Sequence, residues 1–162
     1  MKYFFGFTQI ELLMVMAIIG LLASFGVMTY PGVQKSARDA QRRSDLKQYH
    51  TALESFANGT GGFYPSRLVA QSANSTICSD INLTRCPKDS KADQYVCATG
   101  ICNYYYISNG TGYGNKNATR FVLYCRLEKK VDTQEVYFVL CSDGRSGTKA
   151  VADWTPASTC PL

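Results

Sequence analysis

The first part of the chain is one long apolar run. Residues 7–30 read FTQIELLMVMAIIGLLASFGVMTY, and Glu11 is the single charged residue among them. A helix rises ~1.5 Å per residue, so this stretch is long enough to cross a hydrocarbon core of ~30 Å. We therefore predict a membrane-inserting helix over residues 7–30.

The apolar pattern changes at Pro31 and Gly32. Proline removes a backbone donor and glycine weakens the following turn, so with Gly26 nearby we predict a helix break between Gly26 and Gly32. An amphipathic helix then continues over residues 31–57.

Two stripes of side chains run along this second helix. Small residues at steps of three and four share one face, and they are Val33, Ala37, Ala40 and Ser44. Large apolar residues form a stripe roughly opposite, and they are Leu46, Tyr49, Leu53 and Phe56. From this spacing we expect the first stripe to pack against neighbouring helices and the second to support a globular head.

Charged residues surround these stripes. Arg42 and Arg43 stand beside Asp39 and Asp45, and we interpret the group as a solvated or intersubunit charged surface, with DNA binding as the alternative.

The remaining residues, 58–162, predict a small head with a β-sheet. Asn58 to Gly62 ends the helix, and an irregular region runs from there to about Ile101. Three runs rich in β-branched and aromatic residues follow, and they are 103–108, 120–129 and 134–142. Turn residues 131–133 join the last two runs. We predict an α+β fold in which the long N-terminal helix packs on a small antiparallel sheet with disulfide-bonded loops.

All seven cysteines lie in this head, and none forms a C-x-x-C pair. The distribution favours disulfides in an oxidising compartment, and Cys78–Cys86 and Cys97–Cys102 are the convenient local pairings. Because seven is odd, one thiol is left over or one bridge crosses between subunits. His50 lies far upstream, so a zinc site is poorly supported and we expect no metal.

Composition argues against several function classes. A formal charge of +5, with 18% charged residues, is too mild to imply nucleic acid binding by itself. The sequence shows no recognisable catalytic arrangement of a nucleophile, a general base and a group that orients the base. We therefore expect that the protein is not an enzyme and binds no cofactor. Gly110 to Gly114 lacks the lysine and helix of a phosphate-binding loop, and we interpret it as a flexible hairpin connection.

Glu11 excludes a plain membrane anchor. A carboxylate in an apolar helix costs roughly 2.5–3.5 kcal/mol on insertion scales and is usually functional. No Lys or Arg occurs between Lys2 and Lys35, so the helix offers no side-chain partner. A secretory signal peptide is also disfavoured, because the apolar run is too long and no A-x-A-like cleavage site follows it.

The sequence around Glu11 resembles a known family. Gly6 followed by FTQIELL and MVMAIIGLLA closely resembles the class III signal and N-terminal helix of type IV pilins and of their relatives, the pseudopilins of type II secretion and competence systems. The resemblance implies that residues 1–6 are a leader, that a prepilin peptidase cuts between Gly6 and Phe7, and that the new amino group of Phe7 is methylated. That amino group, with an ordinary pKa of ~7.7–8, is then the partner for Glu11 in its own helix or on a neighbouring subunit.

The resemblance also implies a function. We expect a structural subunit that polymerises through its N-terminal helix into a surface filament for adhesion, motility or DNA uptake, with a pseudopilin as the alternative. The implied partners are further copies or other pilins, the prepilin peptidase, an inner-membrane assembly platform, the membrane before assembly, and a host surface or DNA. The precursor is expected in the cytoplasmic membrane and the product in an extracellular pilus or a periplasmic pseudopilus.

Three further expectations concern the head and the helix. By analogy with pilins, Cys141 and Cys160 close a C-terminal loop, where Asp143 and Asp153 are too few for a calcium cage. Among five N-x-S/T sequons, the one at Asn82 is the candidate for bacterial glycosylation, because Asp80 precedes it. Related pilins lose helix on assembly in the region that corresponds to residues 26–32.

Overall fold

The computed structural model describes residues 6, 8–92 and 103–162, without the side chains of residues 25–29. The chain divides into two compact units, Met1–Lys35 and Ser36–Leu162. Helix α1, Gln9–Gly59, contributes residues to both units.

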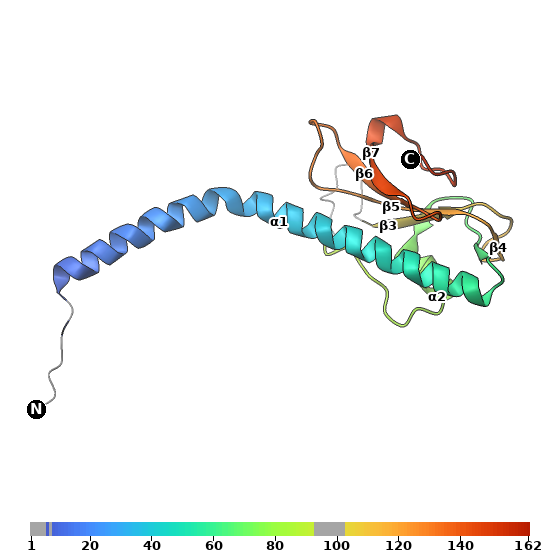
Figure 1. The fold of residues 1–162 in the computed structure, drawn as a ribbon, viewed down its shortest axis with the longest axis horizontal. Helices are drawn as coiled ribbons and strands as arrows, with labels where there is room; N and C mark the ends of the chain where they lie inside the picture. The colour runs from blue at the N-terminus through green and yellow to red at the C-terminus, as the bar shows by residue number, and fades with distance from the viewer. Residues whose placement is uncertain (1–5, 7, 93–102) are drawn as a thin grey trace, which may run out of the picture. The chain divides into compact units, whose positions relative to one another are not determined.

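Helix α1 contains Pro31 without interruption (Figure 1). Proline removes one helical hydrogen bond, but the residues on either side keep theirs, which is enough to carry the helix past it. An interruption at Pro31 and Gly32 is therefore absent from this structure, and loss of helix between Gly26 and Gly32 on assembly stays a prediction.

Within the described residues, no helix combines the length and hydropathy required to cross a membrane. The span predicted over residues 7–30 includes Phe7 and the side chains of residues 25–29, which lie outside those residues, and it stays a prediction.

Helix α1 ends two residues after the predicted end at Ala57. The backbone N–H groups of Thr60 and Gly62 both donate to the Ala57 carbonyl, at 3.0 and 2.8 Å. Gly61 and Gly62 have φ angles of 72° and 90°, a conformation that glycine adopts without steric cost. These glycines turn the chain back toward the sheet.

The head is built on a five-stranded antiparallel sheet in the order β2-β3-β5-β6-β7. Its strands are β2 Gln71–Ser72, β3 Tyr104–Ser108, β5 Phe121–Arg126, β6 Val136–Cys141 and β7 Ser146–Ala150. A second, two-stranded sheet pairs β1 Tyr64–Pro65 with β4 Lys116–Ala118. Short helices fill the connections, and they are η1 Ala73–Ile77, α2 Cys78–Asp80 and η2 Val151–Asp153. The three predicted strands and the α+β fold are confirmed, whereas β7 and the short strands were not predicted.

The sheet is buried on both faces. One face packs against the large stripe of α1, where Leu46, Tyr49 and Leu53 are fully buried and Ala57 takes the place expected for Phe56. The predicted inward residues of β5 and β6 lie in the same cluster, and they are Phe121, Leu123, Cys125, Leu127, Val136, Phe138 and Leu140. Because side chains alternate across a strand, Val122, Tyr124 and Val139 form a second cluster. The C-terminal segment packs against it, so every residue of β5 is buried (Figure 1).

Candidate functional site

The first turn of α1 is closed by three reciprocal hydrogen bonds between Thr8 and Glu11. The Thr8 N–H and hydroxyl both donate to Glu11 Oε2, at 3.3 and 3.2 Å, and the Glu11 N–H donates to Thr8 Oγ1 at 3.4 Å. This is the capping-box arrangement, in which T-x-x-E satisfies free N–H groups at a helix start. Sequence analysis missed this role of Thr8, although the T-x-x-E spacing is visible in the sequence.

The apolar side chains on both sides of Glu11 in the first part of α1 are exposed on every face of the helix. Their exposed fractions range from 46% at Val15 to 78% at Ile10. The other large ones are Leu12, Leu13, Met14, Met16, Ile18, Ile19, Leu21 and Leu22. A water-facing surface of this kind is not stable for an isolated helix, so it marks an interaction site.

The predicted processing and assembly residues lie at the start of this surface. Gly6 is exposed, whereas Phe7 lies outside the described residues. The cleavage between Gly6 and Phe7 and the pairing of Glu11 with the Phe7 amino group therefore stay predictions.

The charged residues at the start of the head form a buried network, so the predicted solvated surface is wrong for Asp39, Arg42 and Asp45. Arg42 is 1% exposed and binds three carboxylates. Its Nε lies 2.5 Å from Asp89 Oδ2, its Nη1 lies 2.9 Å from Asp39 Oδ1, and its Nη2 lies 2.9 Å from Glu128 Oε1. Asp89 and Glu128 are far from Arg42 in the sequence, and their contacts hold its guanidinium inside the head.

Two more cationic side chains and two backbone N–H groups complete this network. Arg38 donates to both oxygens of Glu128, at 2.8 and 2.6 Å, and Lys91 Nζ lies 3.9 Å from the same carboxylate. The hydrogen bonds from Arg38 lower the pKa of Glu128 to about 2. The oxygens of Asp39 also accept the backbone N–H groups of Glu128 and Lys129, both at 2.9 Å. The network thus ties α1 to the end of β5.

Asp45 is buried beside the network. It accepts a hydrogen bond of 2.5 Å from the hydroxyl of Tyr104, a β3 residue that is itself buried. Burial raises the pKa of the Asp45 carboxyl and also that of the Tyr104 hydroxyl. Arg43 is the member of the predicted surface that remains exposed, and its guanidinium lies 5.3 Å from the centre of the Phe138 ring.

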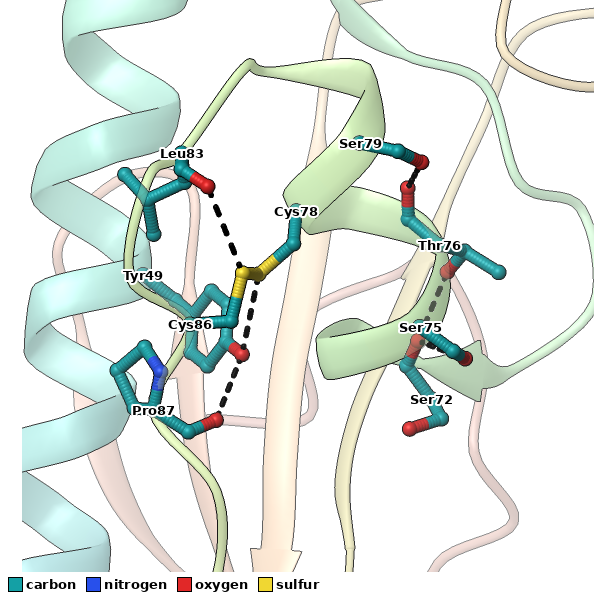
Figure 2. Close-up of a disulfide and its surroundings, with 9 residues drawn as sticks. All are labelled: Tyr49, Ser72, Ser75, Thr76, Cys78, Ser79, Leu83, Cys86 and Pro87. Carbon is teal, nitrogen blue, oxygen red and sulfur yellow. Dashed lines mark hydrogen bonds between the residues drawn. A yellow bond between two sulfur atoms is a disulfide. The ribbon is translucent and has the colours of Figure 1, made fainter.

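The disulfide between Cys78 and Cys86 forms as predicted and lies against α1 (Figure 2). The Tyr49 hydroxyl donates to the Pro87 carbonyl at 2.8 Å and lies 3.5 Å from Cys78 Sγ. Burial raises the pKa of Tyr49, so its hydroxyl keeps its proton. The disulfide and Tyr49 together hold the loop that delivers Asp89 to Arg42.

The Cys141–Cys160 disulfide also forms as predicted. Cys125 is unpaired and 1% exposed, and burial raises the pKa of its thiol. A bridge from Cys125 to another subunit is therefore excluded while the head is folded. The predicted pair Cys97–Cys102 lies outside the described residues.

The Gly110–Gly114 segment connects β3 to β4 and is held by asparagine side chains. Asn109 Oδ1 accepts the backbone N–H groups of Thr119 and Arg120, and Asn117 Nδ2 donates to the Thr111 carbonyl at 2.9 Å. Gly110 has a φ of 100°, and a Cβ there would lie 2.5 Å from Asn117 Oδ1, so the position requires glycine. Asn109 and Asn117 each begin an N-x-T sequon, and the side-chain amide nitrogens of both donate hydrogen bonds within the fold.

The last candidate positions are the Asn82 sequon and the residues around the Cys141–Cys160 disulfide. Asn82 is exposed in a turn with a φ of 52°, and its glycosylation stays a prediction. Asp143 is paired with Arg145 at 2.7 Å. Cys141 and Cys160 lie near Asp143, but they are joined to each other and offer no thiolate to a metal.

Comparisons with known proteins give one local relationship. The chain is 39% identical over 51 residues to the type IV major pilin protein PilA of Myxococcus xanthus (strain DK1622). The match covers 32% of this chain and 23% of that relative. No protein-family model matches the chain. No solved structure matches it. The relative supports the predicted resemblance to the type IV pilin family.

Proposed function

We propose that this chain is a type IV pilin-like structural subunit that polymerises through its N-terminal helix into a surface filament. Adhesion, motility or DNA uptake is the activity that such a filament would serve. The relative is a major pilin, which favours a pilus subunit over the alternative of a pseudopilin.

The observation that carries this proposal is the apolar surface of α1 before residue 25. Large side chains that are between 46% and 78% exposed cover this part of the helix on every side. Complete burial of a fully exposed large apolar side chain contributes about 1.5–3 kcal/mol, so each of these partly exposed side chains would contribute a fraction of that to an assembly. Lipid tails before assembly and neighbouring α1 helices afterwards are the two environments that would bury a helix on all faces.

Processing and assembly follow from the residues before this surface. The prepilin peptidase would cut after Gly6 and methylate Phe7, and the inner-membrane assembly platform would add the subunit to the filament. The Phe7 amino group supplies the positive charge that Glu11 requires in an apolar environment. Such a subunit begins in the cytoplasmic membrane and ends in an extracellular pilus.

Two variants separate the charge of Glu11 from its role in the capping box. Glu11→Gln keeps an oxygen that can accept from the Thr8 N–H but removes the charge, whereas Thr8→Val removes the hydroxyl cap and keeps the charge. We expect Glu11→Gln to abolish incorporation into filaments, and Thr8→Val to reduce it only slightly. Electron microscopy counts the filaments, and mass spectrometry reads the N-terminus of their subunits.

Two results would contradict the proposal. Filament yields equal to wild type for Glu11→Gln would show that the charge does not act in assembly. A mature N-terminus other than methylated Phe7 would show that the processing site is wrong.

A further inference from the structure

Acidic side chains of the head are largely occupied by the head's own donors. Those that accept hydrogen bonds within the head are Asp39, Asp45, Glu54, Asp80, Asp89, Glu128 and Asp143. Several lysines and arginines instead stay at the surface with no carboxylate partner in the described part of the chain.

Three of these cations gather around one groove. It has a volume of about 400 Å³ and lies between α1 and the segment after β5. Arg43, Lys129 and Lys130 supply its positive charge, while Leu127 and Val131 supply apolar wall. Asp39 also lines the groove, but its two oxygens are taken by Arg42 and by backbone N–H groups.

The outer rim of this groove is a tight hairpin turn. Val131 and Gln134 exchange backbone hydrogen bonds of 3.0 and 2.9 Å, and Asp132 and Thr133 between them have φ angles of 47° and 68°. This geometry fixes the turn and presents Val131, which is 47% exposed, directly after two lysines. We call Arg43, Lys129, Lys130 and Val131 the basic hairpin site.

We propose that the basic hairpin site docks on the headgroups of anionic phospholipids. Ammonium and guanidinium groups pair with lipid phosphates, and an exposed apolar side chain beside them can enter the interface. Single-stranded nucleic acid offers the same phosphates, but its binding sites supply aromatic side chains for stacking, and the described lining of this groove has none. The combination of cations with an aliphatic tip therefore favours a lipid surface.

This inference rests on the membrane stage of the proposed function, because a head tethered to the membrane meets headgroups at high local concentration. It adds a role for the head before assembly, independent of any contact within a filament.

The test uses the full chain in nanodiscs of phosphatidylcholine alone or with added phosphatidylglycerol. A short pulse of amine acetylation, read by mass spectrometry, measures the accessibility of each lysine. We expect acetylation of Lys129 and Lys130 to slow several-fold in the anionic discs, while Lys47 and Lys88, exposed elsewhere on the head, keep their rates. High salt should remove the protection.

Variants test the two parts of the site. One lysine near an anionic surface changes affinity by roughly fivefold, so Lys129→Gln should weaken the protection of Lys130 by about that factor. Val131→Ser should weaken it as well, because the apolar tip is lost while the turn keeps its backbone contacts. Lys88→Gln is the matched control and should change nothing.

Several outcomes would overturn the inference. Equal acetylation in the two kinds of disc would do so, and so would uniform slowing that includes Lys47 and Lys88, since that is non-specific attraction. Protection by an oligonucleotide but not by phosphatidylglycerol would reassign the site to nucleic acid. A chain that enters neither disc would count against the membrane stage alone, and anionic vesicles added to the full chain would then test the basic hairpin site directly.

Discussion

Arg42→Met is the substitution that tests the buried network most directly. Methionine fills much of the same volume, so the main change is the loss of the guanidinium. Glu128 keeps both hydrogen bonds from Arg38, and Asp39 keeps both backbone donors. Asp89, whose side chain is 2% exposed, keeps the backbone N–H of Lys91 at 2.8 Å as its one remaining donor among the described residues.

The expected cost follows from this asymmetry. Removing one partner of a buried ion pair costs about 3–5 kcal/mol, because the other charge is left uncompensated, and here that charge is Asp89. Adding Asp89→Asn to the variant should recover roughly 1–3 kcal/mol, since the orphaned charge is removed.

Urea unfolding of the full chain in mild detergent measures these free energies. Urea is preferred to guanidinium because it does not screen ion pairs. Trp154, the single tryptophan, packs against Tyr124 and Tyr137 and reports on the head. Lys47→Met, an exposed position on the same helix, is the control and should stay within about 0.5 kcal/mol. The reasoning is refuted if Arg42→Met costs no more than this control, or if Asp89→Asn recovers nothing.

Three further predictions concern the head. The pKa of Glu128 lies at about 2 rather than near 4.5, so its stabilisation is present above the unfolded value and lost as pH falls toward 2. Glu128→Gln should therefore flatten the fall of the urea midpoint between pH 5 and pH 2, and an unchanged slope would contradict this. Asp45→Asn keeps an oxygen that accepts the hydrogen bond from Tyr104, and it removes the negative charge of a buried carboxyl whose pKa is raised. Because a buried charge is costly, this variant should stabilise the head near pH 7 by up to about 1 kcal/mol. This advantage should fade as pH falls and the wild-type carboxyl becomes protonated; a clear loss of stability at pH 7 would refute it. Replacing Cys141 and Cys160 by serine opens a closed loop and should cost about 3 kcal/mol, measured by the same urea titration. A negligible loss would contradict this and would show that packing alone holds the C-terminal segment.

The sheet was largely predictable because its central strands have strong local signals. Alternating apolar residues from Phe121 to Leu127 identified β5 and its inward face, and the positions at 131–133 identified the turn. Strand β7 has the sequence SGTKA, in which Thr148 is the single β-branched residue and no residue is aromatic, so it carries little of the pattern that marks a strand. Its pairing is set by backbone contacts with β6, which no local pattern encodes.

The buried network was not predictable from the helix alone. On α1 the alternation of Asp39, Arg42 and Asp45 is typical of a solvated face, and the carboxylates that bury Arg42 lie 47 and 86 residues further along the chain. The small residues roughly opposite them, Ala37, Ala40 and Ser44, are exposed, and their packing against neighbouring helices stays a prediction. The face of the helix was therefore readable, whereas the partners of its charges required the tertiary structure.

The network and the Cys78–Cys86 loop attach to the same short stretch of α1, between Asp39 and Tyr49. A pull transmitted along the helix therefore enters the head at its first turns and passes at once into β5 and into a covalently closed loop. The ion pairs of Arg38 and Arg42 with Glu128 and Asp89 cross this junction side by side, so several of them must break together before the helix separates from the sheet. In the proposed filament, this junction is where tension along the helix would reach the head.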